Sequence, residues 1–236
     1  MPYLNGLAAQ YGLATQYFAN AHPSIPNYFM MTTGQFITLD DSFSRTVSAD
    51  NLVRRLIAGG KTWKSYAESL PSVGYTGGDV YPYLRRHNPF SYFSDVINSN
   101  TETNSLVPFS QFSTDLQNNQ LPQFSFVVPN ALNDAHDASL SQADGWLRTN
   151  IAPLIASLQF QQDGLLIIVF DEATDTDLSH GGGQVAAVIV SPLAKPHYQS
   201  TTFYQHEAVL RLILEGLGLT SFPGAGVGAH DMAEFF

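Results

Sequence analysis

Cysteine is absent from all 236 residues of the sequence. Disulfide bonds and thiolate metal sites are therefore excluded, whereas the cellular compartment stays open, because secreted and cytosolic proteins can both lack cysteine. No apolar run reaches the roughly 18 residues of a membrane-spanning helix, so we expect no integral membrane segment. The first residues also lack the pattern of a signal peptide.

Positive charge is scarce. Ten Lys and Arg oppose 20 Asp and Glu, for a formal net charge of −10. Such a chain repels a phosphate backbone overall, so we expect no nucleic-acid partner. A bound metal or a helix N-terminus can still make one pocket positive, because near charges outweigh distant ones. A small anionic substrate is therefore compatible with the composition, and the oligomeric state is not indicated.

Apolar runs alternate with amphipathic segments along the chain, which predicts a layered α/β fold in a single domain over residues 1–236. The run 165–170 is continuously apolar, as is typical of a strand buried on both faces of a parallel sheet. Residues 71–123 lack periodicity and are expected to form a long irregular insertion over the site. We expect further strands at 13–19, 61–67, 124–129 and 185–190, and helices at 3–11, 24–33, 51–58, 141–158 and 203–216.

Ser24 stands at the start of a short predicted helix. Pro26 has a fixed φ and no N–H to lose, which suits a first helical turn, and Gly34 suits the end of the helix. The free N–H groups and the dipole of such an N-terminus favour a serine alkoxide or a bound phosphate. Ser24 is therefore either a nucleophile or only the N-cap of the helix, which is the commoner role of serine there.

Two acidic residues end the most apolar strand. Asp171 and Glu172 directly follow 165–170, where adjacent carboxylates are unfavourable unless a cation neutralises them. Ligands in open α/β sheets bind beyond the carboxyl ends of strands, and carboxylates suit Mg²⁺, Ca²⁺ or Mn²⁺, although Zn²⁺ also accepts them. The alternative is a solvated acidic loop with a hinge at His180–Gly183. We favour a divalent metal of open identity.

Two further segments bring histidine and arginine. His136 follows the strand 124–129, and an imidazole there can serve as metal ligand, phosphate donor or general acid. The alternative is a turn in which Asn and Asp side chains bond their own backbone. The segment Arg85–Asn88 holds the densest positive charge, and its arginines either meet an anionic substrate or lie on the surface. His206 opens the last helix and is not expected to contact the site.

Five motifs occur in an order that resembles the phosphoesterase family, which contains acid phosphatases and bacterial phospholipases C on an alkaline-phosphatase-like fold. The resemblance covers nearly the whole chain and is closest to the acid-phosphatase branch. It implies a three-layer α/β/α sandwich with a mostly parallel central sheet. The motifs are Ser24-x-Pro26-Asn27-Tyr28 with Thr33-Gly34, His87-Asn88-Pro89, Pro129-Asn130 through His136-Asp137, Phe170-Asp171-Glu172, and His180-Gly181-Gly182.

The resemblance also implies roles for individual residues. Ser24 corresponds to the nucleophile and a metal ligand, and Asn27 to a contact with the phosphoryl oxygens. Asp171 and Glu172 correspond to the paired acids that hold the metal. The histidines of the phosphate pocket, one of which is the general acid, correspond to His87 and His136. To the expected substrate-binding set we add Arg86, Asn88 and His180.

One part of the family pattern has no counterpart. The family's sheet begins with a central strand that ends in a Glu-Asn-His-Ser type motif, whose acid and amide also bind the metal. We therefore expect a sheet that lacks its first strand and leaves strand edges uncovered. The metal would have too few oxygen ligands, and this chain alone is expected to be poorly soluble or weakly active.

The expected function is that of a metal-dependent acid phosphatase, which hydrolyses small phosphomonoesters through a phosphoserine intermediate. A phospholipase C-like phosphodiesterase is the alternative within the enzyme class, although the short chain leaves few elements to hold a second ester group. An inactive relative that binds phosphate esters without turnover is the alternative outside that class. The resemblance implies a secreted or periplasmic location.

Overall fold

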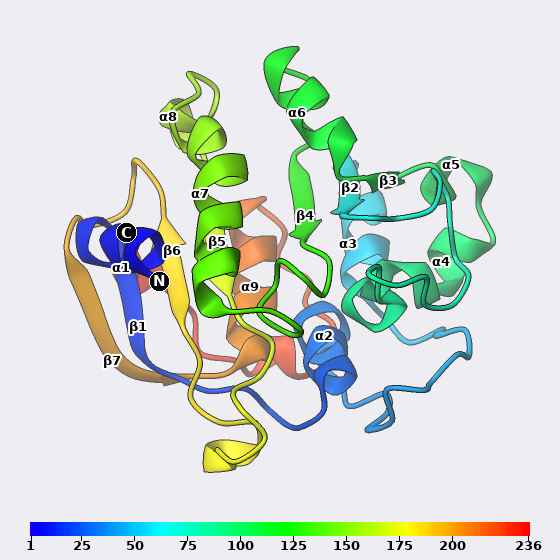
Figure 1. The fold of residues 1–236 in the computed structure, drawn as a ribbon, viewed down its shortest axis with the longest axis horizontal. Coiled ribbons are helices and arrows are strands. Elements are labelled where there is room, and N and C mark those ends of the chain that lie inside the picture. The colour runs from blue at the N-terminus through cyan, green and yellow to red at the C-terminus, as the bar shows by residue number, and fades with distance from the viewer.

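The computed structural model describes all residues, 1–236, and contains two β-sheets. The first has the strand order β5-β6-β1-β7 and the second the order β3-β2-β4 (Figure 1). The second sheet is parallel throughout. In the first sheet, β1 runs parallel to β7, whereas β6 is antiparallel to both of its neighbours. The strands are β1 (Gly12–Tyr17), β2 (Trp63–Ala67), β3 (Leu106–Pro108), β4 (Phe124–Val128), β5 (Leu166–Val169), β6 (Ala187–Val190) and β7 (Tyr198–Tyr204).

Helices cover both faces of the sheets, which gives the expected three-layer arrangement. On one face α1 packs on the first sheet, α6 on the second and α7 on both. On the other face α2 and α3 pack on the second sheet and α9 on both. Figure 1 shows α7 in front of β5, with α9 behind the strands. The helices are α1 (Pro2–Gln10), α2 (Ser24–Thr33), α3 (Leu52–Ala58), α4 (Ser94–Ile97), α5 (Asn100–Thr103), α6 (Ser110–Gln117), α7 (Leu140–Ile155), α8 (Phe160–Asp163) and α9 (His206–Gly216).

Two expectations need correction. The stretch 71–123 is only partly irregular, because it contributes β3 and α6 to the layers. A strand of three residues is too short to show periodicity. The run 165–170 is not buried on both faces, since every residue of β5 is only partly buried. Its position at the edge of the first sheet is the reason. The strand β7 was not expected either, because its sequence, Tyr-Gln-Ser-Thr-Thr-Phe-Tyr, is mostly polar and lacks an apolar run.

The two sheets are not hydrogen-bonded to each other. β4 is an edge strand of the second sheet and β5 is an edge strand of the first, so each has one unpaired edge. The same face of α7 packs on both sheets, which holds them side by side. No helix has the length and apolar character that crossing a bilayer requires.

Candidate functional site

Ser24 is the first residue of α2, and Pro23 before it occupies the cap position in an extended conformation. The Ser24 side chain is 3% exposed and makes no capping bond to the helix backbone. Its hydroxyl instead donates to Oε1 of Glu172, at 2.8 Å. The N-cap interpretation therefore does not describe this serine. Its hydroxyl lies where the positive end of the α2 dipole and a carboxylate meet.

Glu172 also binds His22 through its second oxygen, Oε2, so one carboxylate joins the serine to an imidazole. Burial raises the pKa of Glu172, and the charge of the neighbouring Asp171 raises it further. Burial by itself lowers the pKa of His22, but the Asp177 carbonyl and the Glu172 carboxylate outweigh that effect and raise it. His22 lies two residues before Ser24, and no role at the site was predicted for it.

Asp171 places a carboxylate oxygen in the interior without a partner. Its Oδ2 is buried and accepts no hydrogen bond. Its main-chain oxygen accepts from Nε2 of His206 at 2.7 Å, and the other ring nitrogen of His206 lies 3.0 Å from the Tyr17 hydroxyl. His206 is fully buried, and burial lowers its pKa. His206 therefore does not face the site, as expected, but its hydrogen bond helps to fix the position of Asp171.

The unpartnered oxygen fits a metal ion, because a buried carboxylate oxygen is costly unless a cation or donor meets it. Ligand atoms of His22, Glu172 and Asp175 lie within 4.8 Å of one another and offer one more set of donors. With the hydroxyl of Ser24 on the same carboxylate, the residues present offer oxygen and nitrogen ligands of the kind that divalent cations accept.

The second group of site residues surrounds Tyr28, one helical turn after Ser24 and hence on the same face of α2. The Tyr28 ring stacks on His87 with centroids 5.2 Å apart. Burial raises the pKa of Tyr28 well above its ordinary value, and the charges of Asp171, Asp134 and Glu172 add to the shift. The loops that follow β4 and β5 therefore converge on Tyr28. Tyr28 belongs to one of the sequence motifs, but no role was predicted for it.

His87 and His136 differ in their surroundings. His87 is 4% exposed, bonds Asp134 through Nδ1 at 3.0 Å, and has a buried Nε2 without a partner. The side chain of His136 is 39% exposed and bonds the equally open Asp137. The two rings lie 5.5 Å apart. The structure thus brings both histidines together, but only His87 holds a free nitrogen inside the protein.

Four other predicted residues are already engaged with the protein. Asn27 holds the loop before Ser24: its Oδ1 accepts from the amides of Asn20 and Ala21, and its Nδ2 donates to the Ala21 carbonyl. Asn88 is buried and accepts from the Ser65 hydroxyl at 2.9 Å.

The other two are Arg86, whose side chain is 17% exposed, and His180, which is exposed. Arg86 pairs with the carboxylates of Asp41 and Asp79 at 3.2 and 2.9 Å, so its charge is largely compensated. Asp41 also accepts from the Ile25 amide of α2, a contact that no sequence pattern predicted. His180 packs between the rings of Phe18 and Phe203, with centroids 4.3 and 4.8 Å away, and none of its contacts reaches Ser24.

The glycines after His180 permit a close backbone approach. A Cβ on Gly181 would lie 2.2 Å from the Asn20 carbonyl oxygen, and one on Gly182 would lie 2.3 Å from that of Ala21. Gly181 also has a φ of +108°, which side chains disfavour. The segment that follows the acidic pair therefore packs directly on the loop before Ser24, and it brings Glu172 and Ser24 together.

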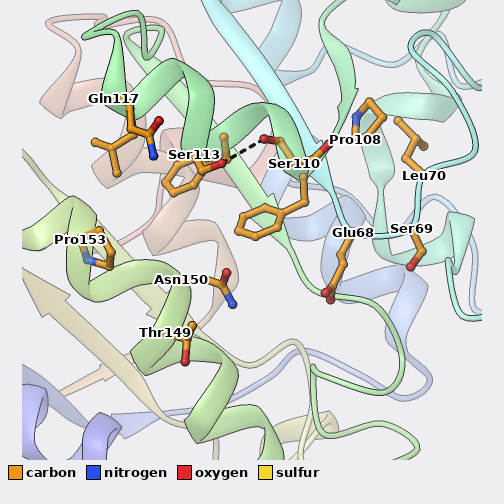
Figure 2. A pocket seen from close by; sticks show the side chains of 13 residues that line it. Glu68, Ser69, Leu70, Pro108, Ser110, Ser113, Gln117, Thr149, Asn150 and Pro153 are labelled. Atoms are coloured by element: carbon orange, nitrogen blue, oxygen red, sulfur yellow. Dashed lines mark hydrogen bonds between the residues drawn. The ribbon is translucent and has the colours of Figure 1, made fainter.

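One cavity lies apart from these residues. It has a volume of about 600 Å³ and opens between α6 and α7, beyond the carboxyl ends of β2 and β3 (Figure 2). Figure 2 shows Glu68 at its edge, and this carboxylate also accepts from the side chains of Asn133 and Trp146. Neither Ser24 nor Asp171 lines the cavity. Its lining is mostly hydroxyl, amide and apolar groups, and Glu68 is the one charged side chain among them.

Comparison with known proteins agrees with this arrangement. A probable acid phosphatase of Kluyveromyces lactis is 32% identical over 97% of this chain and 55% of its own length. An acid phosphatase of Aspergillus fumigatus is 33% identical over 95% and 52%, and a phosphatidylinositol-3-phosphatase of Mycobacterium tuberculosis is 33% identical over 92% and 70%. The chain spans about half the length of the two fungal relatives.

Solved structures show the fold. A member of the alkaline phosphatase superfamily from Vibrio parahaemolyticus matches 94% of this chain and 61% of its own with a TM-score of 0.62, at 12% identity. The lipoteichoic acid synthase LtaP of Listeria monocytogenes matches 98% of this chain and 67% of its own with a TM-score of 0.59. A model of the Phosphoesterase family matches residues 1–220. With the family motifs gathered around Ser24 and Tyr28, this chain belongs to the Phosphoesterase family.

Proposed function

We propose that this chain hydrolyses phosphoric esters and that its substrates are small phosphomonoesters. The observation that carries the proposal is the buried hydroxyl of Ser24, which donates to Glu172 at the N-terminus of α2. The names of the fungal relatives, acid phosphatase and probable acid phosphatase, support the substrate class.

Ser24 is the proposed nucleophile. Its Oγ attacks phosphorus while the bond from phosphorus to the ester oxygen breaks, and water then hydrolyses the phosphoserine. Glu172, which accepts the hydrogen bond from Ser24, is placed to receive the hydroxyl proton. The positive end of the α2 dipole stabilises the negative charge that develops beside Ser24.

Asp171, Glu172 and Ser24 are the residues that would hold a divalent metal. The support is the buried Oδ2 of Asp171, which has no other partner. When bound, such a cation supplies positive charge that lowers the pKa of the serine hydroxyl and neutralises phosphoryl oxygens. The oxygen donors favour Mg²⁺, Ca²⁺ or Mn²⁺, while the imidazole of His22 also suits Zn²⁺.

His87 is the proposed general acid, in preference to His136. Asp134 holds its Nδ1, which orients the ring and leaves Nε2 as the nitrogen that can deliver a proton to the leaving oxygen. The ring stacks on Tyr28, on the same face of α2 as Ser24. His136 is more exposed and bonds Asp137, so it suits an outer contact with the substrate.

The remaining substrate contacts stay predictions. Asn27, Arg86 and Asn88 would each have to exchange a hydrogen bond or ion pair within the protein for one with the substrate. The secreted or periplasmic location inferred from the resemblance is also a proposal. Cell fractionation of the native host would test it.

The test is hydrolysis of p-nitrophenyl phosphate, with and without added divalent metal, by the native chain and by Ser24→Ala. We expect metal-dependent turnover that falls by several orders of magnitude in the variant, because loss of a nucleophile removes the covalent step. Ser139→Ala is the matched control, since Ser139 caps α7 by accepting from the Gln142 amide. It should lose about 1 kcal/mol of stability and keep its turnover.

Retention of more than about a tenth of the turnover by Ser24→Ala would reject the nucleophile. Binding of vanadate by the native chain without any hydrolysis would favour the inactive relative. Faster turnover of bis-p-nitrophenyl phosphate than of the monoester would favour the phosphodiesterase.

A further inference from the structure

Glu68 directly follows β2, and its carboxylate joins three separate segments of the chain. Its Oε2 accepts from the Asn130 amide at 2.9 Å. The side-chain nitrogen of Asn133 lies 3.1 Å from Oε1 and 3.0 Å from Oε2, and donates to this carboxylate. Oε1 also accepts from the indole of Trp146 in α7, at 3.1 Å. One side chain therefore ties the loop after β4, residues 129–137, to the end of β2 and to α7.

The donors that meet this carboxylate are all neutral. They are a main-chain amide, a side-chain amide and an indole. Hydrogen bonds to an ionised acceptor are roughly twice as strong as those between neutral groups. A glutamine at position 68 would have the same shape, but it would present an NH₂ group where these donors need an acceptor. The arrangement is therefore specific for glutamate.

The loop 129–137 is held at a second point by the residue next to Glu68. The Ser69 hydroxyl accepts from Nδ2 of Asn130 at 3.0 Å, and Figure 2 shows Glu68 and Ser69 at the edge of the cavity. The Asn130 carbonyl in turn accepts from the amides of Asn133 and Asp134, at 2.8 and 3.0 Å. The end of β2 therefore holds Asn130, and Asn130 holds the turn that contains Asp134.

Asp134 divides its carboxylate between the two histidines of the site. Its Oδ2 lies 3.0 Å from Nδ1 of His87, and its Oδ1 accepts from the main-chain amide of His136 at 2.9 Å. Because a carboxylate only accepts, Nδ1 of His87 carries the proton in this hydrogen bond. The position of Asp134 therefore determines where the His87 ring directs its buried Nε2, which has no partner.

A turn that bonds only its own backbone was the alternative for this loop, and part of it has that form. Oδ1 of Asn130 accepts from the Leu132 amide at 3.0 Å. The Asn133 side chain, however, leaves the loop, since it donates to Glu68 and accepts from Gln142 at 3.1 Å. Local turn bonds fix the shape of a loop, whereas these distant bonds fix its place relative to the sheet and α7.

We propose that Glu68 is a positioning residue for the general acid: it holds Asn130 and Asn133, which fix Asp134, and Asp134 orients His87. The inference rests on the proposed function, in which His87 delivers a proton to the leaving oxygen. Glu68 lines the cavity between α6 and α7, so it acts through the loop and not on the substrate. A misplacement of about 1 Å at a reacting group can lower a rate by roughly 10²-fold.

The leaving group of the substrate distinguishes this role from a purely structural one. The leaving oxygen of phenyl phosphate is more basic than that of p-nitrophenyl phosphate, because the nitro group stabilises the phenolate. The more basic leaving group depends more strongly on a general acid. The kcat/KM value measures stabilisation of the transition state relative to the free enzyme and substrate. Loss of folded protein lowers kcat/KM equally for both esters, whereas a misplaced general acid lowers it more for phenyl phosphate.

We expect Glu68→Gln to lower kcat/KM at least about tenfold more on phenyl phosphate than on p-nitrophenyl phosphate. His87→Asn gives the full size of the effect. Asp115→Asn is the matched control, because Asp115 is also buried and also accepts several hydrogen bonds. Its partners Tyr66 and Gln111 lie on β2 and α6, away from the loop 129–137. The control should lose stability and keep the wild-type ratio of the two kcat/KM values.

An unchanged ratio in Glu68→Gln, together with a changed ratio in His87→Asn, would overturn the proposal. Asn133→Ala is the second variant, because it keeps Glu68 and removes the tie next to Asp134. It should shift the ratio in the same direction, and it decides the question if Glu68→Gln does not fold. An unchanged ratio in His87→Asn would reject His87 as the general acid, and with it this role of Glu68, without touching the nucleophile.

A measurement without substrate separates failure of this inference from failure of the proposed function. Nuclear magnetic resonance with isotope-labelled histidine detects the proton on Nδ1 of His87, which is assigned by its absence in His87→Asn. We expect it to be protected from exchange with water in the native chain and in Asp115→Asn, and to exchange at least about tenfold faster in Glu68→Gln and Asn133→Ala. Equal protection in all of these proteins, or no protection in the native chain, would overturn the proposal even if neither ester is hydrolysed.

Discussion

Replacement of Asp171 by asparagine should change stability in opposite directions with and without metal. In the wild-type chain, the charge of Asp171 raises the pKa of the neighbouring Glu172. The Oδ2 atom of Asp171 is buried without a partner. Asp171→Asn keeps the shape of the side chain but removes the charge. Without metal, the variant loses a like-charge repulsion and should be more stable than the wild type.

The magnitudes follow from linkage. Relief of the repulsion is on the order of 1 kcal/mol. A cation at 100 times its Kd stabilises a protein that binds it only when folded by about 2.7 kcal/mol. For a chain of this size, about 1 kcal/mol shifts Tm by roughly 2–4 °C. The wild type should therefore gain about 5–10 °C on addition of metal, and the variant close to nothing.

Differential scanning fluorimetry over a titration of Mn²⁺, Mg²⁺, Ca²⁺ and Zn²⁺ measures both effects. Asp163→Asn is the matched control, because it makes the same chemical change at an exposed carboxylate in α8. The control should keep the wild-type response to metal. If Asp171→Asn shows the full metal-induced rise in Tm, Asp171 is not a ligand and the metal site lies elsewhere, with the group His22, Glu172 and Asp175 as the next candidate.

Two further predictions concern the general acid and the C-terminus. His87→Asn should lower kcat on an aryl phosphate by about 10²–10⁴, whereas His197→Asn, at an exposed position, should not; an unchanged kcat would move the role to His136. Glu234 accepts from the hydroxyls of Tyr198, Ser200 and Tyr204, and these bonds outweigh burial and lower its pKa. A carboxyl group whose pKa is lowered by folding stabilises the fold at pH values above the ordinary Glu pKa, and this contribution disappears as pH falls through the folded pKa. The free energy of unfolding, measured by urea denaturation, should therefore fall more steeply with acid in the wild type than in Glu234→Gln. Equal slopes would contradict this.

The elements that the sequence predicted are those with strong local patterns. The helix that starts at Ser24 ends at Gly34, whose φ of 65° is a left-handed cap that glycine adopts without strain. The runs 124–129 and 165–170 form β4 and β5, because short, mostly apolar runs between turn signals favour strands. The helix expected over 51–58 starts at Leu52 and has Asn51 as its cap, a boundary that periodicity does not fix to the residue.

The order of the motifs along the chain also predicted which residues belong to one site. Ser24 meets Glu172, and the loops that carry His87 and Asp134 meet at Tyr28. This much followed from the family resemblance and from the rule that site residues follow the carboxyl ends of strands.

Only the tertiary structure decided which polar atoms are free. Whether Asn27 points to a substrate or to the Asn20–Ala21 backbone depends on a loop that packs against Gly181 and Gly182, far away in sequence. The free Nε2 of His87 and the free Oδ2 of Asp171 arise because segments from different parts of the chain enclose them without a partner. No local pattern encodes such an absence.

Only the tertiary structure decided how the strands are divided between two sheets. The sequence alone determined that an α/β sandwich forms, because apolar periodicity and strand–helix alternation are written residue by residue. The antiparallel course of β6, the edge position of β5 and the shared cover of α7 and α9 depend on pairing between distant strands. Register and neighbour are set by the packing of the whole core, since a strand has two edges and the sequence does not say which is filled.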